Sequence, residues 1–346
     1  MRMWEREFIQ LEETFDGRFH AGRNGIRSVC TPRDRVSEWL VMEDDSAYAR
    51  LRVPFSQPIL YPVREPQLSP GPKAVLMDLD GTSVISEEFW IWTIELTMKE
   101  VLGNTGFLLA REDMPYVSGF SVSEHLQYCM DKYGGGGDIN EARQVYHRTA
   151  ARELQKISQG TGRMEAFRVR PGLREFLRTL KEENIKVGLV TSGLYEKAMP
   201  EILSAFRQME MGDPLDFYDA VVTAGTAYGK GSSGTLGEYS AKPHPWLYAE
   251  IAGVGLGLGE EDRDGIVVLE DSSAGVLAGR LAGFPVIGLE GGNIRQAGVE
   301  SLTHFMADNL QEIVPVLLGD SLGRSVNPGS RKRRGRGTEE KVTDKA

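Results

Sequence analysis

Two carboxylates come directly after a short apolar run in the first third of the chain. Residues 74–77 (Ala-Val-Leu-Met) are typical of a parallel strand buried on both faces, and Asp78, Asp80 and Gly81 follow them. Alternate side chains of a strand share a face, so we expect the two carboxylates to lie close together. Like charges in such proximity are unfavourable unless a cation or a proton lies between them. The pattern therefore indicates a chemical site, with a solvated Asp-rich turn as the alternative.

Further residues that could handle an anionic group also follow apolar runs or lie on a loop. They are Thr191-Ser192 after residues 187–190, Glu270-Asp271 after residues 266–269, and Lys242. The carboxylates of Asp78, Asp80 and Glu270-Asp271 would form an oxygen-only cluster, which suits Mg²⁺ better than zinc. Hydroxyl groups and a lysine suit a phosphoryl group. Together these residue types predict phosphoryl transfer.

The two leading carboxylates suit different steps of such a reaction. Asp78, held by a metal against a phosphate, could attack phosphorus and become an aspartyl phosphate. Asp80 is expected to have no cation in such direct contact, so it could hold a proton for the leaving oxygen. It would then take a proton from water during hydrolysis of the intermediate.

The elements that must position these residues alternate strictly from residue 170 onward. The predicted strands are 74–77, 187–190, 220–222, 266–269 and 285–288, and the predicted helices are 173–180, one ending near 207, 243–251, 273–283 and 310–318. Strict alternation predicts an α/β fold, a Rossmann-like parallel sheet with helices on both faces. Ligands of such sheets gather beyond the carboxyl ends of the strands, where Asp78, Thr191 and Asp271 fall.

The remaining segments divide the chain into parts. Residues 71–83 and 165–318 are the predicted core, and residues 84–164 are predominantly helical and form an insertion. We expect the Trp90 and Trp92 pair of this insertion to be core rather than ligand-facing. Residues 1–70 are an N-terminal extension of unknown role. Six prolines between residues 54 and 72 favour extended chain or a linker there. Just before and within this stretch, Leu51, Val53 and Phe55 alternate with other residues as in a short strand. The extension is expected to be an appendage packed on the core, or else a contact for a partner or a second copy.

Composition excludes several classes of protein. The 346-residue chain has a net charge of −10 and 40% apolar residues, so it has no general affinity for nucleic acid or acidic membranes. Cys30 and Cys129 have no metal-ligand spacing and are expected to be reduced thiols in a cytoplasmic protein. Residues 319–346 are predicted to be a disordered basic tail, and the run at 331–336 is the one hint of a nucleic-acid contact.

The motifs at the strand ends resemble those of a known family. Asp78-Leu79-Asp80-Gly81-Thr82, Thr191-Ser192-Gly193, Lys242-Pro243 and the segment 270–276 (Glu-Asp-Ser-Ser-Ala-Gly-Val) are similar, in order and spacing, to the four motifs of the haloacid dehalogenase-like hydrolases. The resemblance covers roughly residues 73–318. It is strongest to the phosphoglycolate phosphatase and β-phosphoglucomutase subgroup, which inserts a helical cap where residues 84–164 stand.

The resemblance implies a role for each motif residue. Asp78 would be the nucleophile and a Mg²⁺ ligand, and Asp80 the general acid/base and a ligand through its backbone carbonyl. Thr191, Ser192 and Lys242 would bind phosphate. Asp271 would complete the metal site, with Glu270 binding the metal directly or through water. Ser118 and Gly119 resemble the cap loop that closes over substrate, although the family often has a basic residue where Ser118 stands. Lys230, within a Gly/Ser-rich insertion at 225–241, is a rival of Lys242 for the lysine role.

The expected function is that of a Mg²⁺-dependent phosphatase, a phosphoric monoester hydrolase acting on a small phosphorylated metabolite of the sugar phosphate or phosphoglycolate type. A β-phosphoglucomutase-like sugar phosphomutase is the first alternative. A non-catalytic binding or regulatory protein on the same fold is an alternative of another class. The sequence names neither the substrate nor the oligomeric state.

Overall fold

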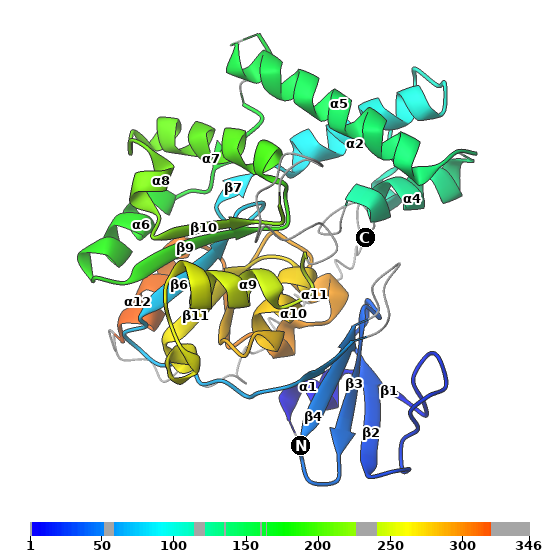
Figure 1. The fold of residues 1–346 in the computed structure, drawn as a ribbon, viewed down its shortest axis with the longest axis vertical. Helices are drawn as coiled ribbons and strands as arrows, with labels where there is room; N and C mark the ends of the chain where they lie inside the picture. The colour runs from blue at the N-terminus through cyan, green and yellow to red at the C-terminus, as the bar shows by residue number, and fades with distance from the viewer. Residues whose placement is uncertain are drawn as a thin grey trace, which may run out of the picture.

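The centre of the molecule is a six-stranded parallel sheet with the strand order β10-β9-β6-β11-β12-β13 (Figure 1). The computed structural model describes residues 2–51, 59–113, 122–134, 136–159, 161–163, 165–225 and 241–319. The strands are β6 Ala74–Asp78, β9 Lys186–Thr191, β10 Ala220–Thr223, β11 Ile266–Glu270, β12 Val286–Leu289 and β13 Phe305–Ala307. The five predicted strands are present. The sixth, β13, was not predicted because a three-residue strand carries too short a pattern.

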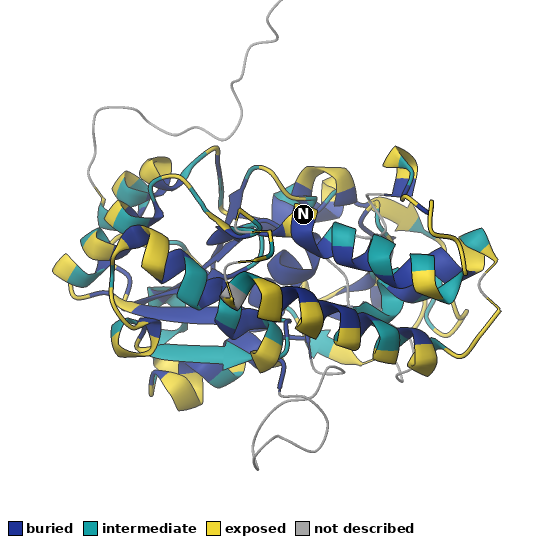
Figure 2. Cartoon of the chain, turned by 90° about the horizontal axis from the view of Figure 1, so that it is seen from above, coloured by how far each residue is buried: buried dark blue, intermediate teal, exposed yellow. Residues whose placement is uncertain are grey.

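Helices cover both faces of this sheet, as expected from the alternation. They are α6 Leu173–Glu182, α7 Tyr195–Met209, α8 Pro214–Phe217, α9 Trp246–Glu250, α10 Ser273–Leu281, α11 Ile294–Ala297 and α12 Ile313–Leu318. Val75 and Met77 of β6 pack into the cluster that contains α6, α7 and α12. Ala74 and Leu76 pack into the cluster that contains α9, α10 and α11. The alternation of side chains along β6 thus directs them to two helical layers. The four central strands between these layers are almost entirely buried, whereas the edge strand β10 is partly exposed (Figure 2).

Several helix boundaries differ from the prediction. The helix expected from residue 243 begins at Trp246, because residues 243–245 (Pro-His-Pro) form a turn, and it continues as a π-helical turn, Ile251–Gly255. Short 3₁₀ turns occupy Arg111–Asp113, Glu260–Gly265, Glu300–Leu302 and Leu310–Glu312. No helix in the described ranges is long and apolar enough to cross a membrane.

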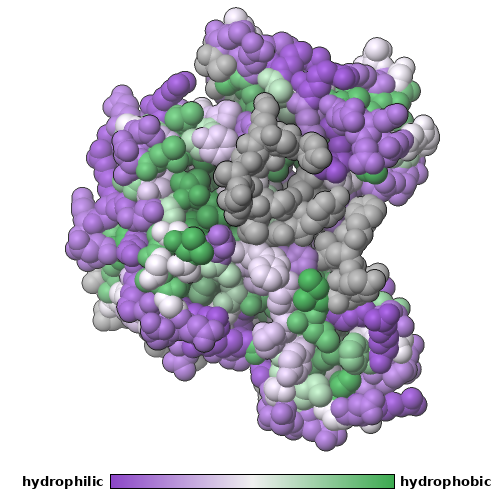
Figure 3. Space-filling model, viewed as in Figure 1, coloured by the Kyte–Doolittle hydropathy of each residue, from purple (hydrophilic) through white to green (hydrophobic). Residues whose placement is uncertain are grey.

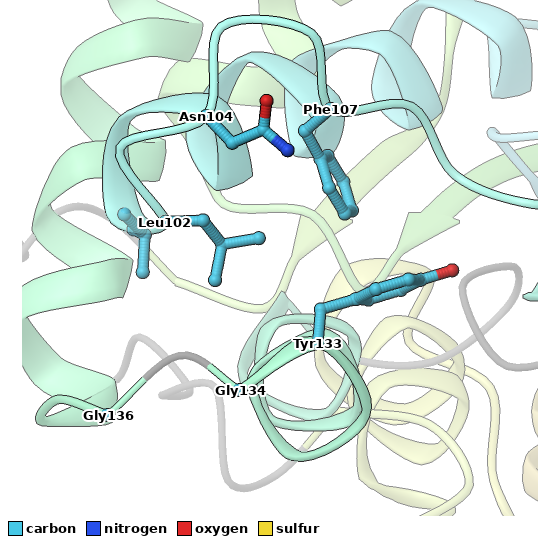
Figure 4. Close-up of a pocket in the computed structure, with 7 residues that line it drawn as sticks. Leu102, Asn104, Phe107, Tyr133, Gly134 and Gly136 are labelled. Atoms are coloured by element: carbon cyan, nitrogen blue, oxygen red, sulfur yellow. The ribbon is translucent and has the colours of Figure 1, made fainter.

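The insertion forms a helical cap, as predicted. Its helices are α2 Glu87–Val101, α4 Val122–Tyr133 and α5 Ile139–Ser158, and a short antiparallel pair, β7 Val84–Ile85 with β8 Arg168–Val169, marks the two crossings between cap and sheet. Trp90 is buried in the cluster shared by cap and core, which confirms the core interpretation, and Trp92 packs against that cluster. A pocket of about 420 Å³ opens between the end of α2 and the end of α4 (Figure 4). It is lined by cap residues such as Asn104, Phe107 and Tyr133.

The N-terminal extension is an additional folded unit. After helix α1 Met3–Glu7, a five-stranded antiparallel sheet runs in chain order, with strands β1 Ile9–Leu11, β2 Ile26–Thr31, β3 Ser37–Met42, β4 Ala47–Leu51 and β5 Leu60–Pro62 (Figure 1). The described part of the proline-rich stretch is extended chain, as the sequence indicated: Pro62 ends the edge strand β5, where a missing N–H is tolerated, and Pro66, Pro70 and Pro72 lie in the connection to β6. The four strands before it, β1 to β4, were not predicted. Val53 and Phe55 lie outside the described residues.

This N-terminal sheet packs on the core rather than standing apart. Trp4, Phe8 and Trp39 belong to the same apolar cluster as Val276 and Leu277 of α10. Most of the described surface in Figure 3 is hydrophilic, with apolar side chains showing in small groups. The packed appendage that the sequence favoured is thus what the structure contains.

Candidate active site

Three carboxylates meet at the carboxyl edge of the parallel sheet. Asp78 ends β6, Glu270 ends β11, and Asp271 follows it. The parallel register places Met77 beside Leu269, so the two strand ends are level. All three side chains are buried, and their oxygen atoms lie within 4.8 Å of one another. The sequence grouped these carboxylates from their positions after apolar runs, and the sheet brings them together.

Lys242 lies between two members of this acidic trio (Asp78, Glu270 and Asp271). Its Nζ donates to Asp78 Oδ1 at 2.5 Å and to Glu270 Oε1 at 2.6 Å. The hydroxyl of Tyr248, from α9, donates to the same Glu270 oxygen at 2.6 Å. Burial alone would lower the pKa of Lys242, but the charges of Asp78 and Glu270 raise it above its ordinary value. Lys242 is therefore a fixed cation in contact with the proposed nucleophile.

The acidic trio has properties that suit a divalent cation. Burial raises the pKa of Asp78, with Glu270 and Asp271 adding to the effect and Lys242 opposing it. Burial and the charge of Glu270 raise the pKa of Asp271 to about 7. Oxygen donors that are buried and short of positive charge fit Mg²⁺.

Two glycines allow the loops to approach the trio closely. A Cβ at residue 81 would lie 2.0 Å from Asp271 Oδ2, and Gly81 also has a φ of +85°. A Cβ at residue 275 would lie 1.8 Å from the carboxylate of Glu270. Because real atoms do not approach so closely, glycine is required at both positions to form this site.

Asp80 belongs to a second group of polar side chains. It lies beyond the end of β6, so strand alternation does not place it beside Asp78 as the sequence suggested. Ser86 Oγ donates to its Oδ1 at 2.6 Å, and Thr191 Oγ1 lies 3.5 Å from its Oδ2. Lys197 Nζ lies 3.7 Å from the same Oδ2. A cation thus lies near Asp80, but at this distance it does not make the direct contact that Lys242 makes with Asp78.

The electrostatics of Asp80 differ accordingly from those of Asp78. Burial alone would raise the pKa of Asp80, but the charge of Lys197 and the hydrogen bond from Ser86 lower it overall. The surroundings of Asp80 thus favour its carboxylate form. Two aspartates two residues apart have pKa values shifted in opposite directions, which is a common basis for different catalytic roles.

Helix α7 supplies residues that the sequence reasoning missed. Lys197 Nζ lies 4.2 Å from the ring centroid of Trp90, whose indole N–H donates to Glu201 Oε1 at 2.8 Å. Burial and the nearby charge of Asp80 raise the pKa of Glu201 well above its ordinary value. A signal existed in the sequence, because Glu201 shares the apolar face of α7 with Ala198, Ile202 and Ala205.

Two of the predicted phosphate-binding residues lie at the carboxyl end of β9, where Thr191 is the last residue of the strand and Ser192 follows it. Thr191 Oγ1 accepts from Gly193 N at 2.9 Å, and Ser192 Oγ accepts from Lys242 N at 3.3 Å. The two phosphate-binding motifs of the resemblance are therefore in direct contact. Ser118, Gly119 and Lys230 lie outside the described residues, as does most of the insertion at 225–241 and all but Gly319 of the basic tail.

Comparisons with known proteins identify a family and several solved structures of similar fold. The model of the haloacid dehalogenase-like hydrolase family matches residues 72–283. A predicted phosphoglycolate phosphatase from Haemophilus somnus is similar in structure, with a TM-score of 0.52, 18% identity and coverage of 71% of this chain and 98% of that one.

Two further solved structures share the fold. CbbY from Rhodobacter sphaeroides, as a variant in complex with xylulose-(1,5)bisphosphate, has a TM-score of 0.53 and 19% identity over 71% of this chain and 99% of its own. A phosphonoacetaldehyde hydrolase-like protein from Oleispira antarctica has a TM-score of 0.54 and 16% identity over 74% and 94% of the two chains. The family match spans more than half of the sequence and includes all four motifs, so the chain belongs to the haloacid dehalogenase-like hydrolases.

Proposed function

We propose that the protein is a Mg²⁺-dependent phosphatase of a small phosphorylated metabolite, acting through an aspartyl phosphate on Asp78. The observation that carries the proposal is the buried Lys242, whose Nζ contacts Asp78 and Glu270 at 2.5 and 2.6 Å. A cation and a carboxylate nucleophile are thus held at one point, where a phosphoryl group needs both charge neutralisation and attack.

Asp78, Glu270 and Asp271 would hold the cation, and the backbone carbonyl of Asp80 is the further ligand that the family resemblance implies. When bound, Mg²⁺ supplies positive charge that neutralises the phosphoryl oxygens. The protein supplies the remaining groups. Thr191 and Ser192 would bind phosphate oxygens, and Lys242 would turn from Asp78 toward the phosphate charge.

The reaction balances with the residues present. A carboxylate oxygen of Asp78 forms a bond to phosphorus while the bond from phosphorus to the leaving alcohol oxygen breaks, and that oxygen takes a proton from Asp80. Water then attacks the phosphoryl group, Asp80 takes a proton from it, and the bond between phosphorus and Asp78 breaks. Inorganic phosphate leaves and both aspartates are restored.

The lowered pKa of Asp80 affects the two halves of the reaction, transfer to Asp78 and hydrolysis of the aspartyl phosphate, in different ways. As a carboxylate, Asp80 is ready to take the proton of water in the second half. In the first half it needs a proton, and a phosphoryl dianion beside Lys197 would offset the charge of that lysine. The pKa of Asp80 would then rise in the substrate complex, because an added negative charge disfavours the carboxylate.

The test is phosphate release from a panel of sugar phosphates, phosphoglycolate, nucleotides and xylulose-1,5-bisphosphate, with Mg²⁺ and with a chelator. We expect release that needs the metal, is abolished by Asp78→Asn, and falls by roughly 10²- to 10³-fold in Lys242→Met. Lys230→Met is the matched control and should retain activity. Loss with Lys230→Met instead would transfer the lysine role to that residue.

A null result on the whole panel would be informative. Isomerisation of sugar phosphates would be assayed next, since a mutase shares the first half of the reaction and differs only in the acceptor hydroxyl. Failure of both assays would contradict the phosphatase proposal and favour a binding protein on the same fold. The cytoplasmic location stays a prediction.

A further inference from the structure

The N-terminal sheet contacts the loop that carries Lys242. Tyr61, on the edge strand β5, has its hydroxyl oxygen 2.7 Å from Nδ1 of His244. His244 is two residues after Lys242 and is 3% exposed. Its backbone N–H donates to Ala241 O at 3.1 Å, which closes a tight turn around Lys242. The backbone of His244 therefore closes the turn, and Tyr61 holds the buried side chain of the same residue.

The same sheet contacts the loop that carries Asp271. Ser273 Oγ, two residues after Asp271, donates to Asp34 Oδ2 at 2.6 Å. Asp34 lies on the connection between β2 and β3, and its backbone N–H donates to Ala297 O at 3.0 Å. Ser273 N donates in turn to Asn293 Oδ1 at 2.7 Å. The start of α10 is thus held from the N-terminal unit on one side and from the loop before α11 on the other.

The two loops share a further property. Each opens a helix, α9 or α10, against which the N-terminal sheet packs. Trp39 and Val41 of β3 lie in one apolar cluster with Leu247 of α9 and Val276 of α10. That cluster accounts for the docking of the sheet by itself, because burying several large apolar side chains contributes far more than one hydrogen bond. The two polar contacts therefore contribute little to the docking energy, and their main effect is to orient the two loops.

We propose that the N-terminal sheet, the unit of residues 2–51 and 59–62, is a positioning unit of the active site. Tyr61 acts through His244 on Lys242, and Asp34 acts through Ser273 on Asp271. This inference rests on the proposed function, because it assigns Lys242 to phosphate and Asp271 to the metal. It also explains why the extension makes polar contacts at these two loops, which docking through the apolar cluster would not require.

The two contacts predict two separable defects. Asp34→Asn leaves one acceptor oxygen for two donors, Ser273 Oγ and Val36 N, and so weakens the support of the loop that carries a metal ligand. Mg²⁺ binding should weaken by about 10-fold, the low end of the effect of residues that orient metal ligands. Removing the Tyr61 hydroxyl frees the turn around Lys242. Tyr61→Phe should therefore weaken binding of inorganic phosphate at saturating Mg²⁺ by a similar factor, and leave the affinity for Mg²⁺ within about twofold.

The chain offers closely matched controls. Asp44, in an exposed turn of the same sheet, accepts the Ser46 hydroxyl at 2.6 Å and the Ser46 N–H at 2.9 Å. Asp34 likewise accepts the N–H of the residue two positions on, Val36, at 3.0 Å. Asp44→Asn thus makes the same chemical change away from the site. Tyr48→Phe is the control for Tyr61, because Tyr48 is on the adjacent strand and 38% exposed.

The experiment is calorimetric titration of the full chain and these four variants, first with Mg²⁺ and then with inorganic phosphate at saturating Mg²⁺, with thermal unfolding recorded for each. Opposite selectivity of Asp34→Asn and Tyr61→Phe, with unchanged controls, supports the inference. Wild-type affinities in both variants would overturn it, as would an equal weakening of both ligands accompanied by lower thermal stability. A wild-type protein that binds neither ligand overturns the proposed function and this inference together. One that binds both but hydrolyses no ester overturns the phosphatase reaction alone.

Discussion

At the scale of single residues, two lysines divide the aspartates of the first motif between two environments. Lys242 contacts Asp78 and Glu270, whereas Lys197 lies 3.7 Å from Asp80. The pKa of Asp78 is raised because burial and neighbouring carboxylates outweigh Lys242. The pKa of Asp80 is lowered because Lys197 and Ser86 outweigh burial. The proposed nucleophile and the proposed acid/base thus lie in different charge environments.

Lys197→Met tests the influence of Lys197 on Asp80. Removing the cation should raise the pKa of Asp80, so a larger fraction of it would be protonated at a given pH and unable to accept a proton from water. We expect the acidic limb of the kcat profile to move to higher pH, and kcat at neutral pH to fall by about 10- to 100-fold. Lys99→Met, at a partly exposed position of α2, should leave the profile unchanged. An unshifted profile in Lys197→Met would contradict this role of Lys197.

At the scale of elements, the cap depends on one buried carboxylate. Asp113, in a 3₁₀ turn between α2 and α4, accepts from Tyr128 at 2.7 Å, from Lys132 at 2.5 Å, from Tyr133, and from Ala110 N at 2.8 Å. Burial alone would raise the pKa of Asp113, but the hydrogen bonds from Lys132, Tyr133 and Tyr128 lower it to about 2. The carboxylate therefore ties the turn to the last two turns of α4.

Asp113→Asn should lower the free energy of unfolding of the cap by about 1–3 kcal/mol at pH 7, because a buried set of donors loses its charged acceptor. The folded pKa of about 2 lies below the ordinary value of 3.8, so this stabilisation is complete above about pH 4 and is lost as pH falls toward 2. Urea unfolding at pH 7 and pH 3 should show the difference between wild type and variant shrinking. Asp131→Asn, which affects an exposed contact with Gln127, is the control. A difference independent of pH would contradict the charged role.

At the scale of the whole molecule, the extension and the catalytic core are one folded body. The parallel sheet separates two apolar clusters, and the second of them continues through α9 and α10 into the N-terminal sheet. Trp4 and Trp39 pack against each other within this cluster, with ring centroids 4.6 Å apart and an interplanar angle of 49°. The N-terminal sheet thus packs on α9 and α10, the two helices that follow the loops of Lys242 and Asp271.

Trp39→Ala should therefore destabilise the core as well as the N-terminal sheet. We expect a loss of about 3–5 kcal/mol, the usual effect of removing a buried large aromatic side chain, within a single unfolding transition. Circular dichroism in urea, together with hydrogen exchange of the α10 amides, would follow both units. Leu60→Ala, at a position 41% exposed on the same sheet, should cost less than about 1 kcal/mol. Two separate transitions, with α10 unaffected, would show that the units fold independently.

Features that depend on a local pattern of residues could be predicted from the sequence. Apolar runs ending in Asp78, Thr191 and Glu270 predicted the strands of the parallel sheet, because a buried strand and its polar end are read from consecutive residues. Parallel strands share a carboxyl edge, so the grouping of Asp78, Glu270 and Asp271 followed without knowledge of any contact. The helical cap followed in the same way from helical periodicity.

Contacts between distant segments could not be predicted from the sequence and are seen only in the tertiary structure. The five short antiparallel strands of the extension are stabilised by pairing with one another, which their interrupted patterns do not reveal. Lys197 faces Asp80 because of the way α7 packs against the sheet, and Tyr61 meets His244 across 183 positions of sequence. Such contacts depend on how elements dock, and docking is set by the summed burial of many side chains. The residue types of the site can thus be recognised from local sequence patterns. The pKa shifts of these residues and the contacts that hold their loops depend on the fold.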